Sequence, residues 1–319
     1  MPFKFNASRR DKFAKAKYRV TNWAEYNEAL RQRGDVTVWF SEDAVSRWCA
    51  VRSGKRGGQQ RYSDLAIETC LTLRAVFGLP LRQTQGFVRS LLRLMQTDLP
   101  VPDFSTLCRR APSLQIAPGT RTASGPIALV VDSTGLRVHG GREWMREKHG
   151  LPKARKIWRK LHIGFDPESG ELVASCLTPQ HVGDTGALPG LLAEVSGPVR
   201  RFIGDGAYDG VPTAATIRHA FGPDVELIIP PPKNAVPGDC QARNAHLDMI
   251  TETGRMAWQR ATGYGQRSRG EAQIGRYKQV IGPELRSRNM ETQTTEARIA
   301  VNALNRMTRL GCAAYERVA

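Results

Sequence analysis

From residue 127 onward, short apolar runs alternate with stretches of helical periodicity, and this alternation restricts the possible folds more than any other feature of the chain. Helical patterns follow the third and fourth runs, at 184–195 and 212–220, and resume at about 267. Three consecutive strands, then helix, strand, helix, strand and helix, predict an antiparallel meander extended by parallel strands. The runs with the length of strands are 127–132, 160–166, 171–178, 199–205 and 225–232.

The sequence before residue 113 has a different character. Residues 1–20 are basic and lack apolar periodicity, which predicts a flexible arm able to touch phosphates. Residues 21–112 show helical periodicity, and a basic segment with Arg109 and Arg110 follows a helix, a short turn and a second helix. That succession is typical of a helix-turn-helix domain, in which these two arginines are candidate DNA contacts. A helical bundle that only dimerises is the alternative.

We therefore predict four parts. A basic arm (1–20) precedes an all-α domain of helix-turn-helix type (21–112), and a linker rich in Gly, Pro, Ser and Thr (113–126) leads to an α/β domain (127–319). The order of elements in this last domain, a mixed sheet with flanking helices, is that of a ribonuclease H-like catalytic domain. Residues 231–262 are predicted to be an irregular insertion on its catalytic face.

The charge of the chain indicates a polyanionic partner. Lys and Arg number 47 against 30 Asp and Glu, giving a formal charge of +17, while 40% of the residues are hydrophobic. Nucleic acid is the leading partner because the basic residues are spread over every segment. No apolar run approaches the roughly 20 residues of a membrane span, and no secretory signal is evident, so we expect a cytoplasmic protein with no membrane partner. The six cysteines show no zinc-site spacing.

Two aspartates follow apolar runs in the same manner: Asp132 after ALVV and Asp205 after RFIG. Ligands gather at the carboxyl edge of parallel strands. If the two strands are neighbours, both carboxylates point at one spot, which their repulsion forbids unless a cation lies between them. Hard carboxylate oxygens favour Mg²⁺ or Mn²⁺. Alternatively, each aspartate only begins a turn.

A third acidic residue lies in a basic helical stretch. Tyr264, Arg267, Glu271 and Lys278 are separated by two, three and six residues. On a helix, positions 267, 271 and 278 fall within roughly 40° of one another, with Tyr264 beside them if the helix extends that far. Glu271 can then reach a metal while the cations reach phosphates, and Gly270 would permit close approach of DNA. A solvated face with an ordinary Arg267–Glu271 ion pair is the alternative.

The spacing of these four residues resembles the signature of bacterial insertion-sequence transposases with a DDE catalytic domain. The blocks WAEYNEALRQRGDVTVWFSEDAVSRW, VVDSTGLRVHG, HVGDTGALPGLL and IGDGAYDG extend the resemblance across nearly the whole chain. Together they are similar to the insertion sequence five family. Asp184 and Asp209 lie within these blocks without an assigned role. Trp158, in the basic segment RKIWRKLH, could stack on an unpaired base, but packing on the sheet is the preferred reading.

The resemblance implies a DNA transposase. Asp132, Asp205 and Glu271 would hold two Mg²⁺ ions, with Mn²⁺ as a substitute, and Tyr264, Arg267 and Lys278 would contact DNA near the transposon end. The implied partner is double-stranded DNA, as transposon ends and as target, and pairing two ends implies a homodimer or larger assembly at the bacterial nucleoid. Two alternatives remain: a non-catalytic DNA-binding protein derived from a transposase, and a host nuclease of the same fold.

Overall fold

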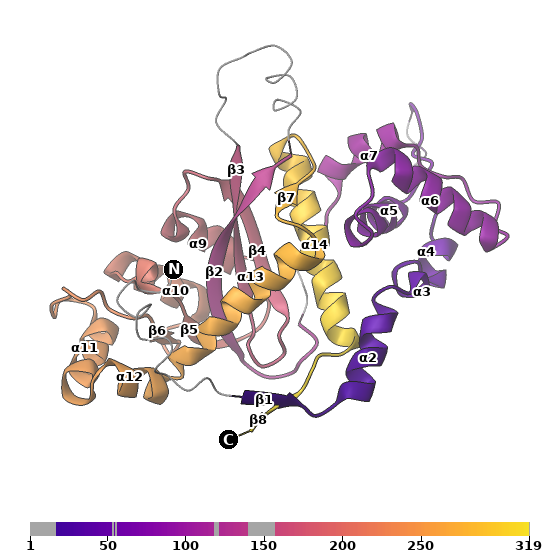
Figure 1. Cartoon of the computed structure of the whole chain (residues 1–319). Helices are drawn as coiled ribbons and strands as arrows, with labels where there is room; N and C mark the ends of the chain where they lie inside the picture. The colour runs from indigo at the N-terminus through magenta and orange to yellow at the C-terminus, as the bar shows by residue number, and fades with distance from the viewer. Residues whose placement is uncertain (1–16, 53, 55, 118–120, 140–156, 319) are drawn as a thin grey trace, which may run out of the picture. The chain divides into compact units, whose positions relative to one another are not determined.

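The computed structural model describes residues 17–52, 54, 56–117, 121–139 and 157–318 (Figure 1). They fall into two compact units: the described residues of Met1–Val38 together with those of Arg306–Ala319, and Trp39–Asn305. The four-part division predicted from the sequence partitions the chain differently and stays a prediction. Within the described ranges, no helix joins the length and the apolar character that crossing a lipid bilayer requires.

In the described part of the chain, the larger unit is built on a mixed sheet of six strands. Five follow the order β4-β3-β2-β5-β6, and β7 pairs with β2 outside this path. The β2–β3 and β3–β4 pairs are antiparallel, whereas β5, β6 and β7 join their neighbours in parallel. The predicted α/β class with a mixed sheet is confirmed. The strands are β2 (Ile127–Val138), β3 (Trp158–Phe165), β4 (Leu172–Pro179), β5 (Val199–Ile203), β6 (Glu226–Ile228) and β7 (Glu284–Leu285).

Helices cover both faces of this sheet. His162 and Cys176 are paired across β3 and β4 and share one face, on which α9 packs with Gly190 beside the sulfur of Cys176. Asp132 points to the other face, where Gly270 of α13 lies against it. The helices after β4 are α9 (Asp184–Leu192), α10 (Val211–Phe221), α11 (Gln241–Thr253), α12 (Arg255–Thr262), α13 (Ser268–Val280) and α14 (Met290–Leu310).

The apolar core of the larger unit lies between the sheet and the helices α9 and α10. Leu129 of β2 and Phe202 of β5 meet Leu191 and Ile217 there, and each is at most 1% exposed. Alternate residues of the strands supply these side chains, so their neighbours point to the face covered by α13. The core thereby fixes which face of β2 and β5 carries polar side chains toward α13.

Local contacts define the helices before the sheet. Ser63 accepts a hydrogen bond from the amide of Ala66 at 3.1 Å and so caps the start of α5. Thr84, Val88 and Leu92 form the buried stripe of α6 at every fourth position. A helix-turn-helix role for these helices stays a prediction. Their bounds are α3 (Val36–Trp39), α4 (Glu42–Ser46), α5 (Asp64–Val76), α6 (Leu81–Leu94) and α7 (Phe104–Arg110).

The smaller unit joins the two ends of the described chain. Strand β1 (Lys17–Val20) pairs antiparallel with β8 (Tyr315–Val318), and α2 (Trp23–Gln32) follows β1. The side chain of Asn22 bonds the carbonyl of Cys312 at 3.0 Å and the amide of Ala314 at 2.8 Å. Most of the predicted basic arm, residues 1–16, lies outside the described residues, but residues 17–20 belong to a strand rather than to a flexible arm.

The predicted irregular insertion at 231–262 is wrong from residue 241 onward, where the chain forms α11 and α12. Helix α11 has no buried residue, so its sequence carries little of the apolar periodicity by which helices are identified. Trp258 of α12 is fully buried, and its indole nitrogen donates to Nδ1 of His246 at 3.1 Å. That contact between helices depends on tertiary packing and has no local sequence signal.

Asn305 of α14 should be a large contributor to stability. It is 2% exposed, and its amide both accepts from the backbone nitrogen of Leu172 and donates to the Leu172 carbonyl, each at 2.8 Å. We expect Asn305→Ala to lower the free energy of unfolding by about 2–4 kcal/mol, because two buried backbone groups lose their partners. Denaturant unfolding measures this. Asn302→Ala is the control, since it removes one exposed hydrogen bond from the same helix.

Candidate active site

Asp132 and Asp205 lie side by side because β2 and β5 run parallel with Val130 opposite Ile203. Each aspartate is the second residue after this matched pair, so the register places both at one level of the sheet. Strand β5 ends at Ile203, whereas β2 continues to Val138. The prediction that Asp132 ends its strand is therefore wrong. It lies within β2, where β5 no longer covers the strand and β7 has not yet begun to pair with it.

Arg267 lies among the three predicted acidic residues. Its Nη2 atom is 3.7 Å from Oδ2 of Asp132 and 3.7 Å from Oδ2 of Asp205, and its Nη1 atom is 3.7 Å from Oε1 of Glu271. Each separation exceeds that of a hydrogen bond, so charge rather than directed bonding draws these groups together. The side chains of Asp132, Asp205 and Glu271 are 13%, 40% and 73% exposed. The site thus opens from a nearly buried aspartate toward solvent at Glu271.

The helix that carries Glu271 approaches the sheet closely at Gly270. A Cβ atom at this position would lie 3.1 Å from Oδ2 of Asp132 and 3.3 Å from the ring of Phe165. Gly270 is buried, and the absence of a side chain lets α13 pack closely on β2. The prediction that Gly270 permits close approach of DNA is therefore wrong. This contact sets the distance between Asp132 and the first turn of α13.

Burial raises the pKa of Asp132, and the neighbouring Asp205 and Glu271 carboxylates raise it further. A hydrogen bond from the Ser133 amide, at 2.8 Å from Oδ1, and the charge of Arg267 oppose that rise. A carboxylate in this position ionises readily only when positive charge is near. Its Oδ1 atom is held by the backbone, which leaves Oδ2 directed at Arg267.

Tyr264 and Lys278 flank this cluster at different distances. Tyr264 belongs to a 3-10 turn (Tyr264–Arg267) that precedes α13, and its ring centroid lies 5.2 Å from that of Trp258. Burial raises the pKa of Tyr264, so its phenol stays protonated and can donate a hydrogen bond. Lys278 is in the last turn of α13, about 10 Å along the helix axis from Glu271. It shares the helix with the acidic cluster but lies well along the axis from it.

The two arginines predicted to read DNA differ in how they are held. Arg110 donates to the carbonyl of Tyr62 at 3.1 Å and forms an ion pair with Asp64, and its side chain is 12% exposed. Arg109 is exposed, with only a long contact of 3.4 Å to the hydroxyl of Thr106. Arg110 therefore ties α7 to the start of α5, and Arg109 is the better placed of the two for an external partner.

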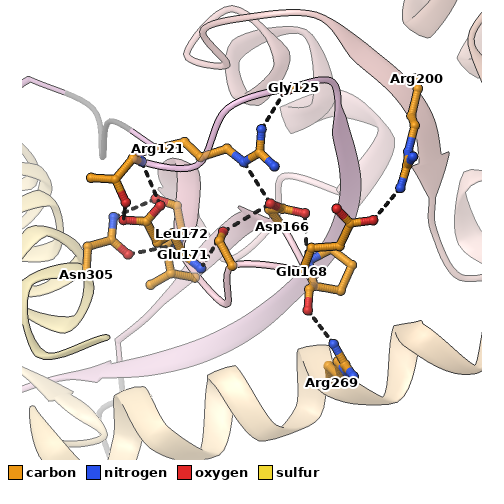
Figure 2. A network of polar contacts seen from close by, with 12 residues as sticks. Arg121, Gly125, Asp166, Glu168, Glu171, Leu172, Arg200, Arg269 and Asn305 are labelled. Carbon is orange, nitrogen blue, oxygen red and sulfur yellow. Dashed lines mark hydrogen bonds and ion pairs between the residues drawn. The ribbon is translucent and has the colours of Figure 1, made fainter. Parts of the chain in front are cut away.

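A polar network that includes Arg269 anchors α13 (Figure 2). By helical geometry, Arg269 and Gln273 lie on the side of α13 opposite Glu271. Arg269 donates to the carbonyl of Pro167, and Gln273 donates to that of Gly170 at 3.1 Å. Both carbonyls belong to the turn between β3 and β4. Because these contacts lie one turn apart on the helix, they restrict its rotation about its own axis and so fix the direction in which Glu271 points.

That turn is itself fixed by a buried ion pair. Asp166 is fully buried and accepts from Nε of Arg121 at 2.7 Å, and Arg121 also donates to the carbonyl of Gly125 at 2.6 Å. Glu171, at the other end of the turn, accepts from the amide of Thr122 at 2.8 Å. Figure 2 shows the segment before β2, the turn and α13 meeting in this network. Sequence reasoning missed it, because Asp-Pro-Glu-Ser-Gly signals only a turn.

Asp184, unassigned from the sequence, lies at the start of α9 on the opposite face of the sheet. Its carboxylate accepts from Nζ of Lys160 at 2.8 Å, and Oδ1 is 3.3 Å from Nδ1 of the fully buried His162. Burial alone would raise the pKa of Asp184, but hydrogen bonds from Lys160 and Ser133 together lower it. Because Ser133 also bonds Asp132 through its amide, Asp184 supports the backbone beside that aspartate.

Asp209 and Trp158 make contacts that stabilise the fold. Asp209 accepts from Nε of Arg243 at 2.9 Å and so connects α11 to the residues that follow Asp205. Trp158 is 41% exposed, and its ring lies 3.2 Å from where a Cβ atom at Gly135 would be. Packing on the neighbouring strand, the preferred reading of Trp158, agrees with this position.

The family described as "Transposase DDE domain" matches residues 123–306, more than half of the chain. A second family with the same description matches residues 31–141. The chain belongs to the DDE-domain transposases. Among solved structures it is similar to the piggyBac transposase in a synaptic complex with hairpin DNA, at 13% identity and a TM-score of 0.38, covering 92% of this chain and 78% of that one.

Gly270→Ala should separate the packing of α13 from its helical propensity. Alanine favours a helix by about 1 kcal/mol over glycine, whereas crowding of Asp132 and Phe165 costs about 1–3 kcal/mol. We expect little gain or a modest loss of stability, together with a clear loss of transposition, because α13 must shift from β2. Thermal unfolding and a transposition assay measure the two effects.

Gly275→Ala is the matched control, because a Cβ there meets no atom within 4 Å and the residue lies on the same helix. It should raise stability by up to about 1 kcal/mol and leave transposition unchanged. Equal behaviour of the two variants would contradict the packing argument.

Proposed function

We propose that this transposase cleaves DNA at the ends of its own insertion sequence by phosphodiester hydrolysis and joins the freed 3′ hydroxyls to target DNA. The observation that carries the proposal is the meeting of Asp132, Asp205 and Glu271 around one guanidinium, in a chain of the DDE-domain family. Membership of the insertion sequence five family and a ribonuclease H-like catalytic domain are part of the proposal. The meander extended by parallel strands supports the fold assignment.

The donor chemistry of the site fits divalent magnesium or manganese. All three side chains offer carboxylate oxygens, and three negative charges against the single charge of Arg267 leave an excess that one divalent ion would neutralise. As they stand, no three His, Cys, Asp or Glu side chains in the described ranges form a group that would hold an ion. We propose that the three carboxylates hold two ions once they draw closer. The ions would stabilise charge on the reacting phosphate and acidify a bound water.

The residues around the carboxylates would position the DNA strand. Arg267 and Lys278 offer cations on one helix stripe, suited to phosphates on either side of the scissile bond. Tyr264 offers a protonated phenol just before the start of α13, beside Arg267. The Arg269 and Gln273 contacts would keep this stripe facing the strand during both reactions. Strand transfer needs no second site, because a 3′ hydroxyl can take the place of the attacking water.

Recognition of DNA ends would fall to other surfaces of the chain. The formal charge of +17 supports a double-stranded DNA partner, and exposed Arg109 remains a candidate contact in the helical region. Arg110 is a weaker candidate because its guanidinium is engaged with Tyr62 and Asp64. We propose a homodimer or larger assembly as the active form, since two transposon ends must be brought together.

Asp132→Asn should abolish cleavage of DNA carrying the inverted repeats of the element, while binding to those ends persists. The change removes the nearly buried charge of the site but keeps the shape of the side chain. A gel assay with end-labelled DNA and Mg²⁺ measures cleavage, and a mobility-shift assay measures binding. Cleavage that survives the substitution would refute the assignment.

A scrambled duplex of the same length separates the alternatives. Selective cutting of the repeat ends and joining of their 3′ hydroxyls to target DNA agree with a transposase. Equal cutting of both duplexes would indicate a general nuclease. Binding without cutting by the unaltered chain would indicate a DNA-binding protein that has lost catalysis.

A further inference from the structure

We propose that Arg267 is a stand-in cation, which holds the three carboxylates together in the free protein and gives up its place when metal ions and DNA bind. The inference rests on the proposed function, because it takes Asp132, Asp205 and Glu271 as the metal-binding residues. It assigns Arg267 a role in the free protein that is distinct from a contact with DNA.

The manner in which Arg267 is held sets it apart from the structural arginines of the chain. Arg121 and Arg243 lie 2.7 Å and 2.9 Å from their carboxylate partners, within hydrogen-bonding distance. Arg267 lies at 3.7 Å from each of three carboxylates and is not hydrogen-bonded to them at that distance. Its buried Nε atom has no hydrogen-bond partner, a feature it shares with the Nε atoms of Arg74, Arg110 and Arg298, so the three equal separations are what distinguish it. The guanidinium is held at the centre of a charge cluster rather than bonded to one member of it.

The charges of the cluster explain why a cation is needed there. Without Arg267, three carboxylates would repel one another, and Asp132 is too buried for water to screen it well. One positive charge reduces this repulsion but leaves a net charge of −2. The cluster is therefore stable enough to persist in the free protein and still attracts a divalent ion.

The same charges imply that a metal ion would replace the Arg267 guanidinium between the carboxylates. A divalent ion between the carboxylates would repel the guanidinium, and a phosphate of DNA bound beside α13 would attract it. Arg267 should therefore weaken metal binding by the free protein. DNA that draws Arg267 away should therefore strengthen metal binding, and because coupling between two ligands is reciprocal, metal should strengthen DNA binding by the same factor. The full complement of ions would then be reached only with DNA in place.

The test is the affinity of the full chain for Mn²⁺ without DNA, measured from the electron paramagnetic resonance signal of the free ion. We expect Arg267→Gln to bind Mn²⁺ about tenfold more tightly than the wild type, because a nearby positive charge is removed from a partly exposed site. Arg267→Lys, which keeps the charge, should bind close to the wild type. In the absence of metal, Arg267→Gln should melt at a lower temperature, and Mn²⁺ should restore its stability.

Arg218→Gln is the control, because it removes the same charge from an exposed position in the last turn of α10 and should leave the affinity unchanged. Equal or weaker Mn²⁺ binding by Arg267→Gln, or no measurable binding by it, overturns the inference. Asp132→Asn separates this failure from failure of the proposed function. If Asp132→Asn leaves Mn²⁺ binding unchanged, the proposed metal site itself is wrong, whereas weakened binding keeps that site whatever Arg267 does.

Discussion

Three carboxylates can share one site only if positive charge lies among them, and much of the larger unit serves to bring these charges to one place. The parallel pairing of Val130 with Ile203 sets Asp132 beside Asp205. Gly270 lets α13 approach until Arg267 reaches both. Repulsion within the cluster then acts against the sheet and the helix that create it. The contacts behind α13, from Arg269 and Gln273 to the turn after β3, are where that force is resisted.

The sequence was sufficient for the elements that have strong local signals. Apolar runs located β2 to β6, and helical periodicity located α9, α10 and the start of α13. The length of β2 was missed because Ser133, Thr134 and Gly135 resemble a turn, whereas pairing with β3 keeps them in the strand. Helices α11 and α12 were missed because α11 buries no side chain. The failures share a cause, namely that distant parts of the chain decide the local structure.

The site shows the same division between local pattern and tertiary packing. The spacing of Arg267 and Glu271 predicted that they share a helix stripe, and their charges meet as an i,i+4 pair. That the same guanidinium also faces Asp132 and Asp205 depends on the register of β2 with β5, which no local pattern records. The ion pair of Arg121 with Asp166 joins segments 45 residues apart and was equally invisible. The roles of these residues in catalysis stay predictions.

The outer edge of the sheet bears on how copies of this protein can meet. A free strand edge is a template onto which another chain can add a strand. On β4 the side-chain amide of Asn305 forms hydrogen bonds with both the amide and the carbonyl of Leu172, and Glu194 accepts from the amide of Ser175 at 3.4 Å. Side chains thus saturate part of the ladder that a neighbouring molecule would need. A second chain could therefore add a strand along β4 only by displacing these side chains, so the fold itself limits growth of the sheet at this edge.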